Sequence, residues 1–382
     1  MKVPFYRHNI GDEEIAKVVE VLRSPIHTAG PVTQEFEKKL AAYLGCQRAV
    51  GVTSWTMGAF LCLRSLGIKP GDEVIIPPLT FLSTANIVCH LGATPVFADV
   101  EPDTGLMDVE AARKAITPRT RAIIPVHIYG AMCDMRALKA LADQHGLYLL
   151  EDAAHCVEGC RDGVRPGQLS EAVCFSFYAT KNLSCGDGGG VASQSAKIAD
   201  HVAKLRFHGM SRGSEERYSG TYRHYDMDEA GYKCNMTDLM AAMLLPQLAR
   251  IESLLARKEA IARRYEQGIA GSPGVDLFKT PPQTKHARHL FPILAPDGKR
   301  DEFLVRLQNK GLGVAVHFNS LHLMKYYRRQ YGFKEGDFPH AERLCRRTLS
   351  LPFYPRLEEV EIDHVIQSVR ETAAELSATH LT

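Results

Sequence analysis

Short apolar runs alternate with helical patterns along much of the chain, from about Val50 to Ser195. The runs are too short for helices and do not alternate strictly between apolar and polar residues, which is typical of strands covered on both faces. Strands that alternate with helices predict an α/β fold around a mostly parallel central sheet, with helices on both faces and ligands at the carboxyl ends of the strands. The predicted strands are Glu73–Pro77, Pro95–Val100, Ala122–Val126, Leu147–Leu150, Ala172–Phe177 and Gly189–Ala192, and helices are predicted at Asp108–Ile116 and Met135–His145.

The pattern changes after Thr237. Asp238–Ala270 is predicted to be one long helix that Pro246 kinks or interrupts, since proline lacks the N–H of a helical hydrogen bond. At 382 residues the chain exceeds one compact core. We therefore expect a large domain of residues 1–245 and a smaller C-terminal α+β domain of residues 246–382. The predicted elements of the smaller domain are strands at Leu290–Ile293 and Gly313–His317 and helices at Asp301–Lys310 and Glu358–Leu376.

Charge and composition argue against several classes of partner. The 46 basic and 44 acidic side chains give a net charge of +2 without a basic stripe, so we expect no nucleic-acid binding. The N-terminal segment lacks the layout of a signal peptide, and no run reaches the ~18 apolar residues of a membrane span, so we expect a cytoplasmic protein without membrane association. Cys156 and Cys160 are not followed by a second pair of ligands at a zinc-like spacing, so we expect reduced thiols and no metal.

Two carboxylates follow directly on a predicted strand, in the sequence Leu149-Leu-Glu-Asp152. Asp152 therefore stands where a parallel sheet presents its ligands. An aspartate at this place can equally cap the next helix, and the sequence alone leaves both readings open.

A lysine follows the next predicted strand. Lys181 comes shortly after Phe177 and is surrounded by aromatic and small residues, which predicts partial burial. Burial lowers the pKa of a lysine because the charged form loses hydration, and the neutral amine is the form that attacks a carbonyl. The alternative is a lysine in a surface loop.

The glycines after this lysine do not form a dinucleotide fingerprint. Gly186 and Gly188 fit the first two positions of GxGxxG, but the third falls on Val191, and the chain contains no GxxxxGK[ST] motif. Nicotinamide and ATP chemistry are therefore disfavoured.

Two further segments carry residues that could bind a cofactor. Ser54 and Thr56 lie at the start of a predicted helix, where free backbone N–H groups bind phosphate, although a plain N-cap is the commoner use. Phe81 follows a strand end and could stack on a flat ring or belong to the core. A lysine, a carboxylate, a stacking face and an anion site are together what pyridoxal 5'-phosphate (PLP) requires.

These segments resemble the DegT/DnrJ/EryC1/StrS family of sugar aminotransferases, and the resemblance extends over nearly the whole chain. It implies the PLP-dependent fold type I with a smaller C-terminal domain. The segments that carry it are Glu14, Leu22–Ser24, Thr28–Pro31, Glu35–Glu37, Gly67–Val74, Leu79–Phe81, Leu91–Val96, Pro125–Gly130, Glu151–His155 and Phe175–Leu183. Within the family, Phe207–Gly209, Gly231–Asp238, Val316–Phe318, His322 and Tyr326-Tyr327 are similar to the enzymes that aminate UDP-linked 4-keto-L-arabinose for lipid A modification.

The resemblance also implies roles for single residues. Lys181 would carry the cofactor covalently and move protons, while Asp152 would pair with the pyridine nitrogen. Asn235 would reach the phosphate from a partner subunit, which implies a homodimer with shared active sites. His155 would lie at the 3-hydroxyl side of the ring, and Phe81 would stack on its face. The residues that would hold the phosphate are Ser54, Trp55, Thr56 and Ser176. His317 and His322 would contact the sugar nucleotide, although both histidines could equally be structural.

The sequence departs from the family in its phosphate loop, where Trp55 replaces the usual glycine or alanine. Either Trp55 points into the substrate site or the loop is displaced. Gly186-Asp-Gly-Gly is a milder change, since the relatives more often have glutamate there.

The implied reaction transfers an amino group from glutamate to a keto carbon, C4 by resemblance, of a nucleotide-linked keto-sugar such as a UDP-4-keto-pentose or a UDP- or dTDP-linked 4-keto-6-deoxyhexose. The sugar dehydratases of the same family carry histidine at the lysine position, so Lys181 argues against that alternative. A non-catalytic, regulatory homologue is disfavoured by the presence of both Asp152 and Lys181.

Overall fold

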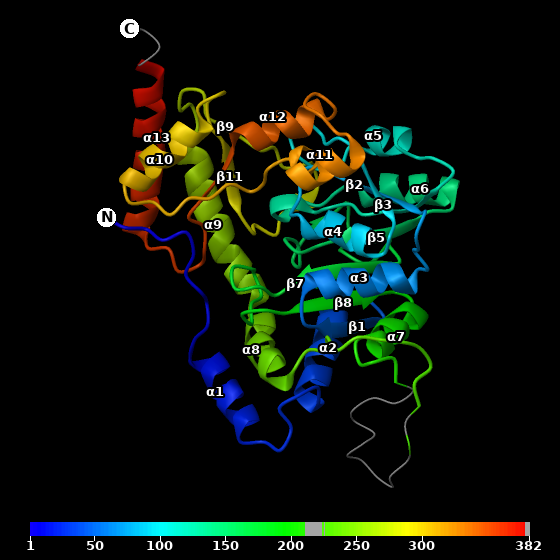
Figure 1. The fold of residues 1–382 in the computed structure, drawn as a ribbon. Helices are drawn as coiled ribbons and strands as arrows, with labels where there is room; N and C mark the ends of the chain where they lie inside the picture. Colours follow the sequence, from blue (N-terminus) through cyan, green and yellow to red (C-terminus); the bar gives the residue numbers. More distant parts are fainter. Residues whose placement is uncertain (211–223, 225, 379–382) are drawn as a thin grey trace.

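The computed structural model describes residues 1–210, 224 and 226–378, and it contains a seven-stranded, mostly parallel sheet in the order β1-β8-β7-β5-β4-β2-β3 (Figure 1). The neighbouring strands from β3 to β7 are parallel, whereas β8 runs antiparallel to both β7 and β1. The α/β fold predicted from the alternating runs is therefore confirmed. The strands are β1 (Arg48–Val52), β2 (Glu73–Ile76), β3 (Thr94–Phe97), β4 (Thr120–Ile123), β5 (Tyr148–Asp152), β7 (Ala172–Ser176) and β8 (Gly189–Ser193).

The sheet separates two hydrophobic cores, because successive side chains of a strand point to opposite faces. In β2, Ile75 belongs to the first core, and its neighbours Val74 and Ile76 belong to the second. Burial on both faces explains why the strand sequences are apolar without strict alternation. The first core is covered by α2 (Pro31–Leu44), α5 (Val109–Lys114), α6 (Met135–His145) and α8 (Asp238–Ala249), and the second by α3 (Trp55–Ser65), α4 (Ser83–His90) and α7 (Ala196–Leu205).

A third hydrophobic core lies in the C-terminal part of the chain, beside α9. It also contains Val3, which forms an isolated bridge with Leu312, so the N-terminal segment packs against the C-terminal region. No observation tests the domain boundary at residues 245/246, which stays a prediction. The elements of this region are α9 (Ile251–Ile269), β9 (Asp276–Leu277), β11 (Phe291–Leu294), α10 (Arg300–Asn309), α11 (Lys325–Tyr331), α12 (Pro339–Arg347), β12 (Thr348–Leu351) and α13 (Glu359–Ala378).

Short elements connect the larger ones. They are the two-residue strands β6 (Cys160–Arg161) and β10 (Thr284–Lys285), which pair with each other, and the 3-10 turns η1 (Ile128–Gly130) and η3 (Leu321–Leu323). Among the described residues, no single helix is long and apolar enough to cross a membrane. Only α8 and α9 taken together meet that requirement, by length and composition, and they are bent by 64°.

Two predicted elements differ from the structure. Gly313–His317 is not a strand, since Ala315 forms only one isolated bridge to Ser350, and the strand beside β11 is β12 instead. The long helix is two helices, and it breaks at Arg250 rather than at Pro246. Pro246 is accommodated inside α8, and its carbonyl still accepts the N–H of Arg250 at 3.3 Å.

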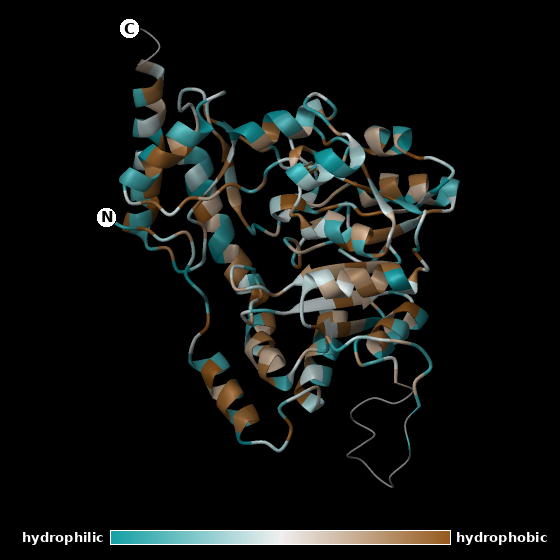
Figure 2. Cartoon of the chain, in the orientation of Figure 1, coloured by the Kyte–Doolittle hydropathy of each residue, from teal (hydrophilic) through white to brown (hydrophobic). Residues whose placement is uncertain are grey.

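The helix α1 (Asp12–Leu22) packs against α8 with one face and leaves the other exposed. Its Glu14 is buried and forms an ion pair of 2.6 Å with Arg250. On the exposed side, Ile15, Val19 and Leu22 form an apolar stripe. Much of α1 is coloured brown, for apolar residues, in Figure 2.

One buried carboxylate joins the starts of two helices. Asp238, in the first turn of α8, is 1% exposed and accepts hydrogen bonds at 2.9 Å from the N–H groups of Gly30 and Thr33. The hydroxyl of Thr33 donates to the same oxygen at 2.6 Å. Asp238 therefore satisfies the free N–H groups at the start of α2, which Gly30 itself cannot cap with a side chain.

We predict that Asp238→Ala lowers the free energy of unfolding by about 3 kcal/mol, because it leaves several buried donors without an acceptor. The measurement is the midpoint of urea unfolding followed by circular dichroism. Asp301→Ala, which removes an exposed carboxylate at the start of α10, is the control and should leave the midpoint nearly unchanged. Equal midpoints for the two variants would contradict this account of Asp238.

Candidate active site

A cavity of about 480 Å³ lies at the carboxyl ends of β5 and β7, where a mostly parallel sheet presents its ligands. Residues from the start of α3, from the loop between β2 and α4, and from the C-terminal part of the chain complete its wall. The cavity brings together the sequence-predicted residues Ser54, Trp55, Thr56, Phe81, Asp152, His155, Ser176, Lys181 and His317.

Asp152 is the last residue of β5 and is 5% exposed. The hydroxyl of Thr84, in α4, donates to one of its carboxylate oxygens at 3.1 Å, and the N–H of Ala154 donates to the other at 3.1 Å. Burial raises the pKa of Asp152 to about 6, although these hydrogen bonds oppose the rise. The carboxylate is therefore mostly ionised at neutral pH and can pair with a positively charged ring nitrogen.

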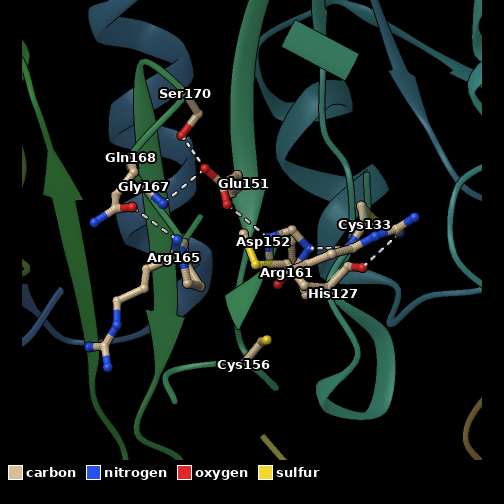
Figure 3. A network of polar contacts seen from close by, with 12 residues as sticks. His127, Cys133, Glu151, Asp152, Cys156, Arg161, Arg165, Gly167, Gln168 and Ser170 are labelled. Carbon is tan, nitrogen blue, oxygen red and sulfur yellow. Dashed lines mark hydrogen bonds and ion pairs between the residues drawn. The ribbon is translucent and has the colours of Figure 1, made fainter. Parts of the chain in front are cut away.

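The preceding residue, Glu151, points to the opposite face of the sheet and is fully buried there. Its carboxylate accepts hydrogen bonds from Gly167 N–H at 2.9 Å, from the Ser170 hydroxyl at 2.5 Å and from Nε2 of His127 at 2.8 Å (Figure 3). Nδ1 of His127 accepts the N–H of Cys133 at 3.2 Å, so the proton of this histidine lies on Nε2. This network fixes the end of β5 from behind and thereby holds Asp152 in place.

Lys181 follows β7 and lines the cavity together with Asp152. Its backbone N–H donates to the carbonyl of Tyr178 at 2.8 Å, which makes the tight turn that returns its side chain to the cavity. Burial lowers the pKa of Lys181 to about 8, against the opposing charge of Asp152. About a tenth of its amine is therefore neutral at pH 7, and this neutral form is the one that acts as a nucleophile.

The residue after this lysine is held by a buried pair of charges. The side-chain amide of Asn182 donates to Glu158 at 2.8 Å and to the carbonyl of Ala287 at 2.7 Å, and its oxygen accepts from Lys258 of α9 at 2.7 Å. Glu158 and Lys258 are both at most 5% exposed. Their opposite charges, joined through Asn182, anchor the segment that carries Lys181.

The start of α3 forms the anion-binding part of the cavity. Ser54 is the N-cap, and its side chain accepts the N–H of Met57 at 3.1 Å. The N–H groups of Trp55 and Thr56, the first two residues of the helix, have no partner within the helix and are placed to bind phosphate. A Cβ atom at Gly189 would lie 2.5 Å from the Trp55 nitrogen, so glycine is needed for this loop to pack on β8.

Trp55 begins α3 and lies 4% exposed in the second hydrophobic core, where it also forms part of the cavity wall. The loop therefore accommodates the large residue by burying its indole. Phe81 is 53% exposed at the cavity, and its ring lies 5.9 Å from that of Phe318. A planar ligand can contact such a face.

Two sequence-predicted residues lie outside this cavity. His322 is fully buried, bonds to Glu342 at 3.1 Å through Nε2 and packs against Phe338, so its place in the structure is that of a core histidine. Asn235 is 5% exposed, pairs with Val52 and accepts the Lys233 ammonium at 2.5 Å. It does not line the cavity of its own chain.

The sequence did not single out three residues that the structure brings to the site. His289 lines the cavity and its ring lies 4.3 Å from that of His155. Thr84 bonds to Asp152, and Tyr129 bonds to His155. Tyr129 lies in a segment of the family resemblance and Thr84 does not, but nothing in the sequence places either of them beside its partner. Among the described residues, no group of three or more His, Cys, Asp or Glu side chains could hold a metal ion.

Comparison with known proteins identifies the family. Residues 8–370 match the model of the DegT/DnrJ/EryC1/StrS aminotransferase family, and the chain belongs to it. It is 43% identical to the spore coat polysaccharide biosynthesis protein SpsC of Bacillus subtilis (strain 168), over 97% of this chain and 96% of that protein.

Solved structures agree with this assignment. The structure of DesV from S. venezuelae has a TM-score of 0.88 and 39% identity, covering 94% of each chain. The putative sugar aminotransferase Spr1654 from Streptococcus pneumoniae, solved in PMP and PLP forms, has TM-scores of 0.93 and 0.91 and 30% identity over 98% of this chain and 100% of that chain. The chain has the fold of PLP-dependent type I aminotransferases, and its cofactor is PLP.

The cavity fits this cofactor. A lysine with a partly neutral amine and a buried, ionised carboxylate line one space, beside a helix start whose N–H groups are free to bind phosphate. The exposed ring of Phe81 supplies a face for stacking.

We predict that the pKa of Lys181 governs cofactor uptake. Because burial lowers this pKa to about 8, the rate at which cofactor-free protein takes up PLP should rise about tenfold per pH unit below 8 and level off above it. The rate is measured by stopped-flow absorbance, and a simple primary amine treated in parallel corrects for the ionisation of PLP itself. If the corrected rate still rises tenfold per pH unit above pH 9, the pKa of Lys181 is that of an ordinary exposed lysine, and the prediction is wrong.

Proposed function

We propose that the chain transfers the amino group of glutamate to the C4 keto carbon of a nucleotide-linked keto-sugar, such as a UDP-4-keto-pentose or a UDP- or dTDP-linked 4-keto-6-deoxyhexose. The observation that carries this proposal is that Asp152, at the end of β5, and Lys181, in the loop after the neighbouring parallel strand β7, line one cavity beside the start of α3. The family and its sugar-aminotransferase structures support the sugar class of substrate.

PLP, when bound, supplies the electron sink that the reaction needs. Lys181 would hold the cofactor covalently, and its Nζ would accept and return the proton at the substrate carbon in both half-reactions. The Asp152 carboxylate would accept the ring N–H and keep that nitrogen protonated. Ser54, Thr56, Ser176 and the N–H groups at the start of α3 would bind the phosphate, while Phe81 and His155 would contact the ring.

The sugar would bind in the same cavity beside the cofactor, in contact with His317 and with the exposed side chains of Phe81 and Tyr178. Burial and the neighbouring Lys181 lower the pKa of His317 to about 4, so this histidine is neutral and can donate or accept hydrogen bonds to sugar hydroxyls. The resemblance to the 4-keto-L-arabinose enzymes remains the most specific prediction of the sugar. SpsC, by its name, serves a spore coat polysaccharide, which favours a role in surface polysaccharide synthesis.

We also propose that the enzyme works as a homodimer, with Asn235 of one subunit completing the phosphate site of the other. Two observations support this: Asn235 does not line the cavity of its own chain, and the apolar stripe of Ile15, Val19 and Leu22 is exposed in the single chain. The ten cysteines are all free thiols, which supports a reducing compartment such as the cytoplasm.

The first test is spectroscopic. We predict that glutamate abolishes the yellow absorption band of the purified PLP-containing protein and that a suitable keto-sugar restores it. Lys181→Ala should slow this exchange by about 10²–10⁴-fold, because it removes the acid–base group. Lys279→Ala, at an exposed surface lysine, is the matched control and should behave as the wild type. A band that glutamate leaves unchanged in the wild type would contradict glutamate as the donor.

The second test asks whether the site is shared. We predict that mixing Lys181→Ala and Asn235→Ala subunits restores about a quarter of the wild-type activity, since random pairing gives heterodimers with one intact site. Mixing Lys181→Ala with Asp152→Ala is the control, because both residues belong to the same chain's cavity and every site stays defective. Recovery in neither mixture would contradict the role of Asn235 across the interface.

A further inference from the structure

Tyr129 is a buried residue of η1 that contacts all three histidines of the cavity. Its N–H donates to Nδ1 of His155 at 3.1 Å, and its carbonyl accepts the N–H of His289 at 3.0 Å. Its hydroxyl donates to the carbonyl of His317. The three histidines come from distant parts of the sequence, and each is held by a different polar group of this one residue.

The backbone of this segment has an unusual conformation. Tyr129 has a φ of 59°, in the left-handed region that tyrosine seldom adopts, and it is 2% exposed. Gly130 follows with a φ of 112°, and a Cβ atom there would lie 2.8 Å from the Arg288 nitrogen and 3.0 Å from the His289 nitrogen. The turn thus packs directly against the backbone that precedes β11. This close packing brings the carbonyl of Tyr129 within hydrogen-bond distance of the His289 N–H.

The hydrogen bond from Tyr129 fixes the tautomer of His155. Since Nδ1 accepts a backbone N–H, it carries no proton, and the ring proton lies on Nε2. Burial and the nearby Lys181 hold the pKa of His155 well below its ordinary value, so the ring is neutral. His155 is therefore a neutral hydrogen-bond donor through Nε2.

The tyrosine hydroxyl acts on the other side of the cavity. It bonds to the carbonyl of His317, to which the hydroxyl of Thr348 also donates at 3.3 Å. Nδ1 of His317 lies 3.0 Å from the hydroxyl of Ser350. The loop that carries His317 is thus fixed jointly by Tyr129 and by β12.

We propose that Tyr129 is a positioning residue: its backbone holds His155 and His289 on the cofactor side of the cavity, and its hydroxyl holds His317 on the sugar side. The two sides can then be separated by experiment. The backbone bonds set the tautomer of His155, and the hydroxyl sets the place of the His317 loop. The expected kinetic effects rest on the proposed function, whereas the tautomer of His155 does not.

The tautomer is tested on cofactor-free protein by ¹⁵N NMR of histidine-labelled chain, with the His155 signals assigned from their loss in His155→Gln. We expect protonated Nε2 and unprotonated Nδ1 at neutral pH. An imidazolium, or a proton on Nδ1, would overturn the proposal even if the protein is a fully active aminotransferase. The expected result would stand even if glutamate and keto-sugars proved not to be its substrates.

A pair of isosteric substitutions gives a second readout. The amide of His155→Gln can accept the Tyr129 N–H and still donate into the cavity, whereas His155→Glu offers only acceptors. We expect the glutamate variant to bind PLP at least tenfold more weakly than the glutamine variant, measured by fluorescence titration. Equal affinities of the two variants would overturn the proposal.

The hydroxyl is tested with Tyr129→Phe, which keeps the backbone bonds. We expect KM for the keto-sugar to rise by up to about tenfold, with the rate of the glutamate half-reaction and the ¹⁵N signals of His155 unchanged. Thermal unfolding of the variant controls for a general loss of stability. Equal slowing of both half-reactions, or no change in either, would overturn the role assigned to the hydroxyl.

Discussion

The site depends on the burial of two opposite charges at the carboxyl ends of β5 and β7. Asp152 and Lys181 line one cavity, and the loss of hydration raises the pKa of the carboxyl group to about 6 and lowers the pKa of the amine to about 8. Each is held by neighbouring polar groups: Asp152 by Thr84 and by the network of Glu151 behind the strand, and Lys181 by the anchoring of Asn182. The sheet therefore supplies rigid positions, and burial supplies the reactivity.

The cavity is built from different parts of the chain. Most residues proposed to act on the cofactor come from the ends of β5 and β7, the loops that follow them and the start of α3, whereas His317 and Phe318 come from the C-terminal region. Tyr129 connects the two sets, because it lies on the loop after β4 and bonds to residues of both.

The sequence predicted the central sheet well because strands buried on both faces must be apolar almost throughout. It missed β1, which begins with the exposed Arg48 and has glycine as its fourth residue, and β12, whose sequence Thr-Leu-Ser-Leu is half polar. Residues that end strands could be assigned to the site, since the rule for parallel sheets gives their location. His289, Tyr129 and Thr84 could not be assigned as partners, because their contacts join segments that only the folded topology brings together. His322 resembled a ligand in sequence, but its neighbours Phe97, Phe333 and Phe338 place it in a packed aromatic cluster.

The central claim is that Lys181 carries the cofactor, and the most direct test is to locate the covalent bond. Borohydride reduction of the PLP-containing protein, followed by proteolysis and mass spectrometry, identifies the lysine that retains the cofactor. The account predicts a pyridoxyl phosphate group on Lys181 in the wild type and none at any stoichiometric site in Lys181→Ala. A cofactor fixed to a different lysine, such as the buried Lys258, or a protein that retains no cofactor after reduction, would contradict it.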